Sequence, residues 1–325
     1  MKYKYRRYLF KWTPAQVLVN WMRKIRFKRW DNVSLYKIIK LFTRNLMQDE
    51  IVGRANGVAF NFILAIFPAV IFLFTLIPYV TTVVPEVNTQ SIMQFLEQML
   101  PASMYDVISS TVLDIVSNQR GGLLTFGFLF SLYLATNGMM ALMGAFNACY
   151  KTDDRRGAIK MRLIATGLTV NLAFVLFLAI ILLVVGQLVL NYVQSNLGEF
   201  VWMSNVNVYL LFALRFMVIF IVFFLAVSTI YYFGPAIHYN WRFFSIGSFL
   251  ATLFILLISY GFSYYITHFG TYNKVYGSIG VLIALMIWIQ LITIVLLVGY
   301  ELNASIHDAA RMQALWHGRR FKKNN

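Results

Sequence analysis

Four polar side chains lie in or beside strongly apolar segments, where their chemistry would be shielded from water: Asn61, Asn137, Glu301 and Asn303. An acid at such a position can hold a proton or a cation. A buried amide needs a hydrogen-bond partner, which a neighbouring helix or a ligand can supply. Two interpretations therefore stay open. The four residues line a polar cavity, or each only bonds a neighbouring helix.

Glu301 is the acid closest to an apolar interior, near the inner end of the last apolar segment. It could serve as a proton or cation site, or it could form an ion pair at the interface with Arg54, Arg155 or Arg156. In the first apolar segment, Pro68 removes a backbone donor and is expected to kink the helix. Carbonyls freed by such a kink need partners, and Asn61 lies about two turns away.

A second cluster lies between the last two apolar segments and holds Tyr272, Asn273, Tyr276, Gly277 and Gly280. Tyrosines are common anchors at the membrane interface. The glycines suit a tight turn or a short re-entrant segment. An aromatic-lined polar pocket on the outer face and an interfacial turn are both compatible with this pattern.

The residue pattern does not indicate catalysis. The four histidines are His238, His268, His307 and His317, and none has metal-site spacing to another ligand. No phosphate-binding glycine loop and no nucleophilic serine motif occurs in the sequence. We therefore expect a protein that is not an enzyme, with no catalytic residue, metal or cofactor.

The elements that position these residues are apolar. Hydrophobic residues make up 60% of the chain and charged residues 12%, against about 45–50% and 25% in soluble domains. A membrane-spanning helix needs about 20 mostly apolar residues. Six segments qualify, at roughly 55–80, 122–147, 163–192, 213–234, 243–267 and 278–304. The sequence predicts an all-α, polytopic integral membrane protein.

The distribution of basic residues predicts its orientation. Of the 28 lysines and arginines, 14 lie in residues 1–54, five in 151–162 and five in 311–323. Basic residues favour the cytoplasmic side and meet anionic lipid there. We therefore expect both termini inside, anionic lipids of the cytoplasmic leaflet as partners, and no nucleic-acid partner despite the net charge of +16.

Three regions follow from this topology: a basic amphipathic segment at 1–50, a six-helix membrane domain at 51–306 and a basic cytoplasmic tail at 307–325. The first region should form one or two helices that lie on the membrane or pack on the bundle. Two short amphipathic helices are expected in the first external loop. Small residues recur every four positions, which predicts close helix packing. They are Gly53, Gly57 and Ala65, then Gly127, Ser131 and Ala135, then Gly247 and Ala251.

The stretch Phe269–Gly280, followed by Trp288 and by Gly299-Tyr300-Glu301-Leu302-Asn303-Ala304, resembles the YihY/BrkB family of bacterial inner-membrane proteins, formerly mislabelled ribonuclease BN. Gly121–Leu124 with Ala135–Gly138, and Tyr231–Pro235, resemble other family segments. The resemblance implies a six-helix protein of the inner membrane and an association with export of lipid or lipopolysaccharide precursors. The expected function is translocation of a lipid-like or amphiphilic substrate. The alternative is a non-transporting envelope scaffold or interaction protein.

Overall fold

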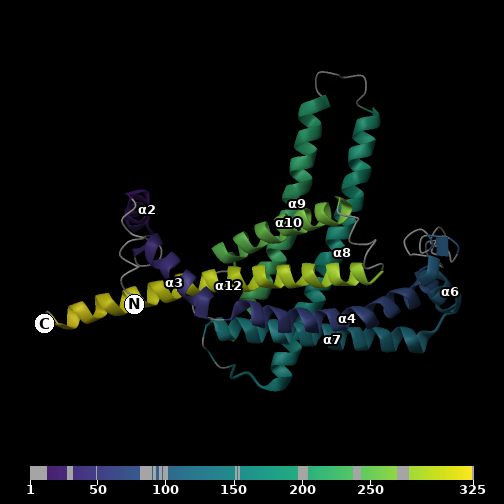
Figure 1. Ribbon diagram of the computed structural model, residues 1–325, viewed down its shortest axis with the longest axis horizontal. Helices are drawn as coiled ribbons and strands as arrows, with labels where there is room; N and C mark the ends of the chain where they lie inside the picture. The colour runs from purple at the N-terminus through teal and green to yellow at the C-terminus, as the bar shows by residue number, and fades with distance from the viewer. Residues whose placement is uncertain are drawn as a thin grey trace.

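The computed structural model describes residues 13–27, 32–48, 50–80, 102–150, 152, 154–196, 204–236, 243–268 and 278–323, together with the single residues 90, 93, 94 and 97. Helices dominate this part of the chain (Figure 1). They are α2 (Thr13–Lys24), α3 (Leu35–Gln48), α4 (Ile51–Val80), α6 (Ala102–Ser117), α7 (Gly121–Cys149), α8 (Ala158–Asn196), α9 (Ser204–Phe233), α10 (Ile246–His268) and α12 (Ser278–Lys323). Two short strands, β1 (Arg26–Phe27) and β2 (Val33–Ser34), pair antiparallel.

Six of the described helices are long and apolar enough to cross a membrane, which confirms the predicted number of spans. They are Ile51–Tyr79, Gly121–Cys149, Ala158–Ala179, Ala213–Phe233, Ile246–Ile266 and Leu282–Leu315. α8 begins earlier than expected, so that Lys160 and Arg162 belong to the helix. α12 continues without a break through residue 306, where the cytoplasmic tail was expected to begin, and ends at Lys323.

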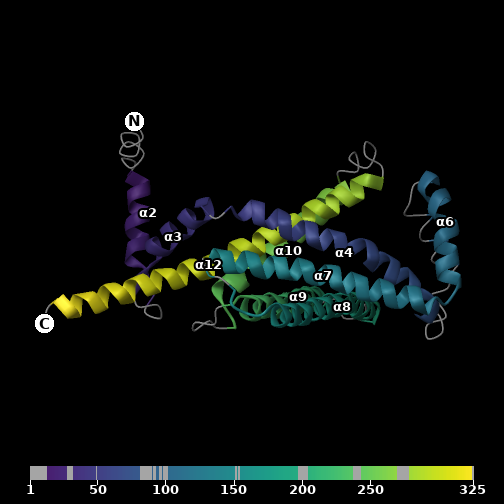
Figure 2. The same cartoon turned by 90° about the horizontal axis from the view of Figure 1, so that it is seen from below.

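The six helices form two groups. α4 packs along α7 and α12, and α12 also packs along α10. α8 and α9 form a pair that crosses α4 and α7 steeply in Figure 1 and lies to one side of them in Figure 2. The buried core lies near the inner ends of α7 and α9 and halfway along α12. Phe146 and Tyr300 stack there with ring centroids 4.3 Å apart, and Tyr231 packs edge-on against both.

Small residues bring particular helix pairs into close contact. An added Cβ at Gly127 would lie 3.3 Å from the Phe72 backbone on α4, and one at Gly247 would lie 2.1 Å from the Gly299 carbonyl oxygen on α12. The predicted close packing is confirmed at these two glycines. Gly53 and Gly57 differ, because nothing lies within 4 Å of a Cβ added there. Spacing alone therefore does not identify the face of a helix that meets a neighbour.

The two N-terminal helices have different environments. α3 packs against the inner part of α12 through Ile38 and Leu41, which contact Ile306 and Ala309. α2 rises away from α12 (Figure 2) and exposes apolar side chains, with Trp21 57% exposed. α6 accounts for the second helix expected in the first external loop. The first one falls mainly outside the described residues.

Candidate functional site

Glu301 is completely buried in α12. Its Oε1 accepts hydrogen bonds from Asn45 Nδ2, at 2.8 Å, and from Ser305 Oγ, at 3.1 Å. Asn45 is itself 4% exposed and belongs to α3. Glu301 therefore joins the last membrane span to an N-terminal helix through a partner that is 256 positions away in the sequence. Arg156, one of the three basic partners considered for Glu301, pairs with Asp154.

Asn303 faces a different neighbour. Its Oδ1 accepts a hydrogen bond from the Gly247 backbone N–H, at 2.8 Å, and its Nδ2 donates to Ser245 Oγ, also at 2.8 Å. Ser248 continues this polar contact to α9, because its hydroxyl bonds Ser228 Oγ at 3.1 Å. Asn303 thus fixes the first turn of α10 against α12, at the same end of the bundle as Glu301.

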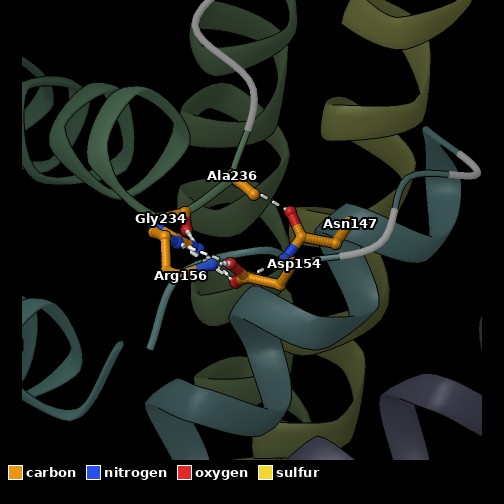
Figure 3. Close-up of polar contacts among 5 residues, drawn as sticks. All are labelled: Asn147, Asp154, Arg156, Gly234 and Ala236. Atoms are coloured by element: carbon orange, nitrogen blue, oxygen red, sulfur yellow. Dashed lines mark hydrogen bonds and ion pairs between the residues drawn. The ribbon is translucent and has the colours of Figure 1, made fainter. Parts of the chain in front are cut away.

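A polar clamp connects the ends of α7 and α9 (Figure 3). It consists of Asn147, Asp154, Arg156, Gly234 and Ala236. Arg156 Nη2 lies 2.6 Å from Asp154 Oδ2 and donates to the Gly234 carbonyl at 2.8 Å. Asn147 donates to Asp154 at 3.0 Å and accepts from the Ala236 N–H at 2.7 Å. The hydrogen bond from the Arg156 side chain lowers the pKa of Asp154, against partial burial, which raises it. The clamp ties the ends of α7 and α9 to the connection before α8.

The Asn137 side chain is hydrogen-bonded to an arginine of the next helix. Its Oδ1 accepts a hydrogen bond of 2.5 Å from Arg162 Nη1 on α8, and the same nitrogen lies 3.3 Å from Met140 Sδ. The guanidinium carbon lies 4.4 Å from the centre of the Tyr133 ring. Asn137 is ten residues from Asn147 in the clamp, which is about 15 Å along α7. Arg162, the fifth residue of α8, therefore meets α7 about halfway along α7, where the two helices cross steeply.

Amides also lie on the outside of the bundle. Gln290 Nε2 on α12 donates to Asn56 Oδ1 on α4 at 2.8 Å, and Asn56 is exposed. Asn61 donates to the Gly57 carbonyl of its own helix at 2.8 Å. α4 remains helical through Pro68.

The four residues predicted to line a polar cavity therefore have separate partners. Asn61 bonds its own helix, Asn137 bonds α8, Glu301 bonds α3 and Asn303 bonds α10. Among the hydrogen bonds of the described residues, none joins one of the four to another.

The predicted outer-face pocket cannot be placed as a whole. Tyr272, Asn273, Tyr276 and Gly277 lie outside the described residues, and Gly280 is buried in the first turn of α12. In the part of the chain that is described, no three His, Cys, Asp or Glu side chains gather as metal ligands would.

Sequence reasoning missed several residues of these polar sites, among them Asn45, Arg162 and the Asn56–Gln290 pair. Asn45 follows the apolar stripe of α3, and Arg162 was counted with a basic loop. Gln290 is the only amide of its apolar run between Ser278 and Glu301. That isolation is the one signal that could have identified it.

Comparison with known proteins identifies relatives. The family model described as "Virulence factor BrkB" matches residues 42–320. A Bacillus subtilis protein named "Putative ribonuclease-like protein YfkH" is 31% identical over 273 residues, which cover 84% of this chain and 96% of that protein. A UPF0761 membrane protein of Tolumonas auensis is 38% identical over 74 residues, 23% of this chain and 24% of that protein. No solved structure matches.

Proposed function

The chain belongs to the virulence factor BrkB family of multi-pass membrane proteins, and we propose that it is a translocator that moves a lipid-like, amphiphilic molecule across the bacterial cytoplasmic membrane. The observation that carries this proposal is the Gln290–Asn56 amide pair. It joins two membrane spans and is exposed on the outside of the bundle.

The depth of the amide pair supports a role in translocation. Asn56 lies five residues into α4, about 7.5 Å from the start of the helix, and Gln290 lies eleven residues before Glu301, about 17 Å along α12. Amides cost free energy in hydrocarbon unless polar groups reach them. An amphiphile that keeps its tails in the bilayer could pass its polar headgroup along such amides. Glu301 would then act at the inner end of the path, and Asn137 would act deeper in the membrane than the amide pair.

Reconstitution in vesicles tests the proposal. The full chain is incorporated into vesicles that carry headgroup-labelled phospholipid on both leaflets, and a membrane-impermeant quencher is added outside. Stimulated movement exposes the inner label to the quencher. We expect the wild type to stimulate quenching, and we expect less stimulation for Asn56→Leu combined with Gln290→Leu, for Asn137→Ala and for Glu301→Gln.

The matched control is Asn118→Ala, because Asn118 is an exposed amide beyond the end of α6 that bonds Asp114 outside the spans. It should leave the movement unchanged. Absence of stimulated movement by wild-type protein with every labelled lipid class would reject the translocator. An equal loss of lipid movement in Asn118→Ala and in the amide variants would reject the proposed headgroup path along these amides.

A scaffold function is favoured by a different observation, the exposed apolar face of α2. Val17 is 67% exposed, Leu18 56% and Trp21 57%, and Arg23 and Lys24 end the helix. Replacing these three apolar residues by serine should then abolish capture of an envelope partner. The α3–α12 packing does not involve them, so the bundle should remain folded. Undiminished capture by this variant would exclude α2 as the docking surface.

We further propose that the chain has no nuclease activity and acts without a cofactor. The sequence supplies only 12 acidic residues for acid–base chemistry, and its histidines are far apart. Protein purified free of soluble nucleases should leave RNA intact. RNA cleavage that copurifies with the chain through every step would overturn this proposal.

A further inference from the structure

We propose that Arg162, with Asn137 and Tyr133, binds the phosphate group of an anionic phospholipid on the flank of the bundle. The site lies where α8 crosses α7. It requires no transport and would exist in a scaffold as well, so it stands independently of the proposed function.

The charge of Arg162 is not neutralised within the described chain. The ion pairs found there are Arg156 with Asp154 and Arg120 with Asp114, and neither involves Arg162. Its described contacts are neutral: an amide oxygen, a thioether sulfur and an aromatic ring. Arg162 is the fifth residue of α8, near one end of that span. A charged arginine among apolar side chains still costs free energy, up to the roughly 2.5–3.5 kcal/mol that insertion scales give at the centre of a span. An anion from the surroundings would remove much of that cost.

The geometry leaves donors for that anion. Both hydrogen bonds of the guanidinium use Nη1. Nη2 and Nε make no hydrogen bond to the described residues, and Arg162 is only partly buried. These two nitrogens form one edge of the planar guanidinium, which matches two oxygens of a phosphate group. Asn137 holds the opposite edge, and the guanidinium carbon lies over the Tyr133 ring.

The neighbouring surface indicates that the phosphate comes from a lipid. Ile159 and Leu163 lie three residues before and one residue after Arg162, and they are 80% and 67% exposed. Tyr133 is 52% exposed. A guanidinium framed by exposed apolar side chains on a membrane span faces acyl chains on both sides. The phosphate of a phospholipid can bind the guanidinium while its acyl chains contact the apolar side chains, whereas free phosphate can bind only the guanidinium.

The experiment measures lipid retention by the full-length chain purified in detergent. Wild-type protein and variants are incubated with phosphatidylglycerol, with phosphatidylcholine, or with phosphatidylglycerol plus excess inorganic phosphate, and bound lipid is counted by native mass spectrometry. We expect wild type to prefer phosphatidylglycerol. Arg162→Gln should weaken its binding about tenfold or more, the loss expected for hydrogen bonds to a charged group.

Two further variants keep the test decisive if Arg162→Gln does not fold. Arg162→Lys keeps the charge but not the planar fork, and it should show a smaller loss of phosphatidylglycerol. Arg155→Gln removes one exposed positive charge close by in the sequence and should leave binding at the wild-type level. Each variant is compared by size-exclusion profile and helical circular dichroism before lipid is added.

Three results would overturn the proposal. Equal losses in Arg155→Gln and in the Arg162 variants would mean that only general surface charge matters. Displacement of lipid by inorganic phosphate would assign the site to a free anion. Equal retention of phosphatidylglycerol and phosphatidylcholine by the wild type would remove the charge preference that the site requires.

Discussion

Substitution of Gly247 by alanine should destabilise the bundle strongly, because α10 and α12 touch there backbone to backbone. A Cβ at Gly247 would lie 2.1 Å from the Gly299 oxygen and 2.6 Å from Asn303 Cγ, whereas ordinary contact begins at 3.4 Å. The helices must therefore separate by 3.4 − 2.1 = 1.3 Å along that line. The hydrogen bond from Gly247 N–H to Asn303, now 2.8 Å, would be stretched by this separation beyond the usual N–H···O limit of about 3.2 Å.

The expected free-energy cost has two parts. Forcing an extra methyl group into a packed contact costs about 1–3 kcal/mol. Leaving the buried Asn303 oxygen or the Gly247 N–H unsatisfied costs about 1–3 kcal/mol more. The free energy of unfolding should therefore fall by about 2–6 kcal/mol, which is large for one added methyl group.

The assay is thermal unfolding in detergent, followed as loss of the monodisperse peak in size-exclusion chromatography. Gly261→Ala is the matched control, because it lies on the same helix and has nothing within 4 Å of an added Cβ. Alanine there should raise stability by up to about 1 kcal/mol through helix propensity. If Gly247→Ala unfolds at or above the wild-type temperature, the backbone contact between α10 and α12 is refuted.

Three other predictions concern polar side chains. Glu301→Leu should remove the shorter hydrogen bond of the buried Asn45 amide, leave it only the 3.4 Å contact with Ser305 Oγ, and cost about 1–3 kcal/mol, seen as faster hydrogen–deuterium exchange in α3; exchange as slow as in Glu301→Gln would contradict it. Because Arg156 lowers the pKa of Asp154, the clamp contributes fully above the ordinary aspartate pKa of about 3.9 and weakens as pH falls through the lowered value. Melting temperatures of wild type and Asp154→Asn should therefore differ by a constant amount between about pH 5 and 8 and converge in acid. Arg120→Gln should change stability by less than about 1 kcal/mol, since the Arg120 side chain is 47% exposed; a larger loss in the same melting assay would show that its ion pair is structural.

The membrane architecture could be predicted from the sequence because it follows from local composition. Hydropathy over about 20 residues locates each span, and basic loops orient them. Boundaries were less predictable where charged residues join a helix. Lys160 and Arg162 were assigned to a loop, because hydropathy alone places the start of a span after them.

The polar contacts could not be predicted, because they depend on how helices cross. The sequence left open a proton or cation site at Glu301 and an ion pair with an arginine. The structure adds a partner that was not considered, Asn45, which reaches Glu301 because α3 packs on α12 through Ile38 and Leu41. Arg162 meets Asn137 only because α8 crosses α7 steeply (Figure 1). Residue type showed which side chains needed partners, and the crossing angles of the helices determined which partners they found.

The contact between Gly247 and Gly299 lies close to the midpoint of the long helix α12, about which α12 could tilt. With 46 residues, α12 is about 69 Å long, more than twice the roughly 30 Å hydrocarbon thickness. Gly299 lies 21 residues from Ser278 and 24 from Lys323, so the contact divides the rod into arms of about 32 and 36 Å. If α12 tilted about the Gly247–Gly299 contact, its two ends would move by nearly equal distances in opposite directions. α3 packs on the C-terminal half of α12, so it would move together with that half.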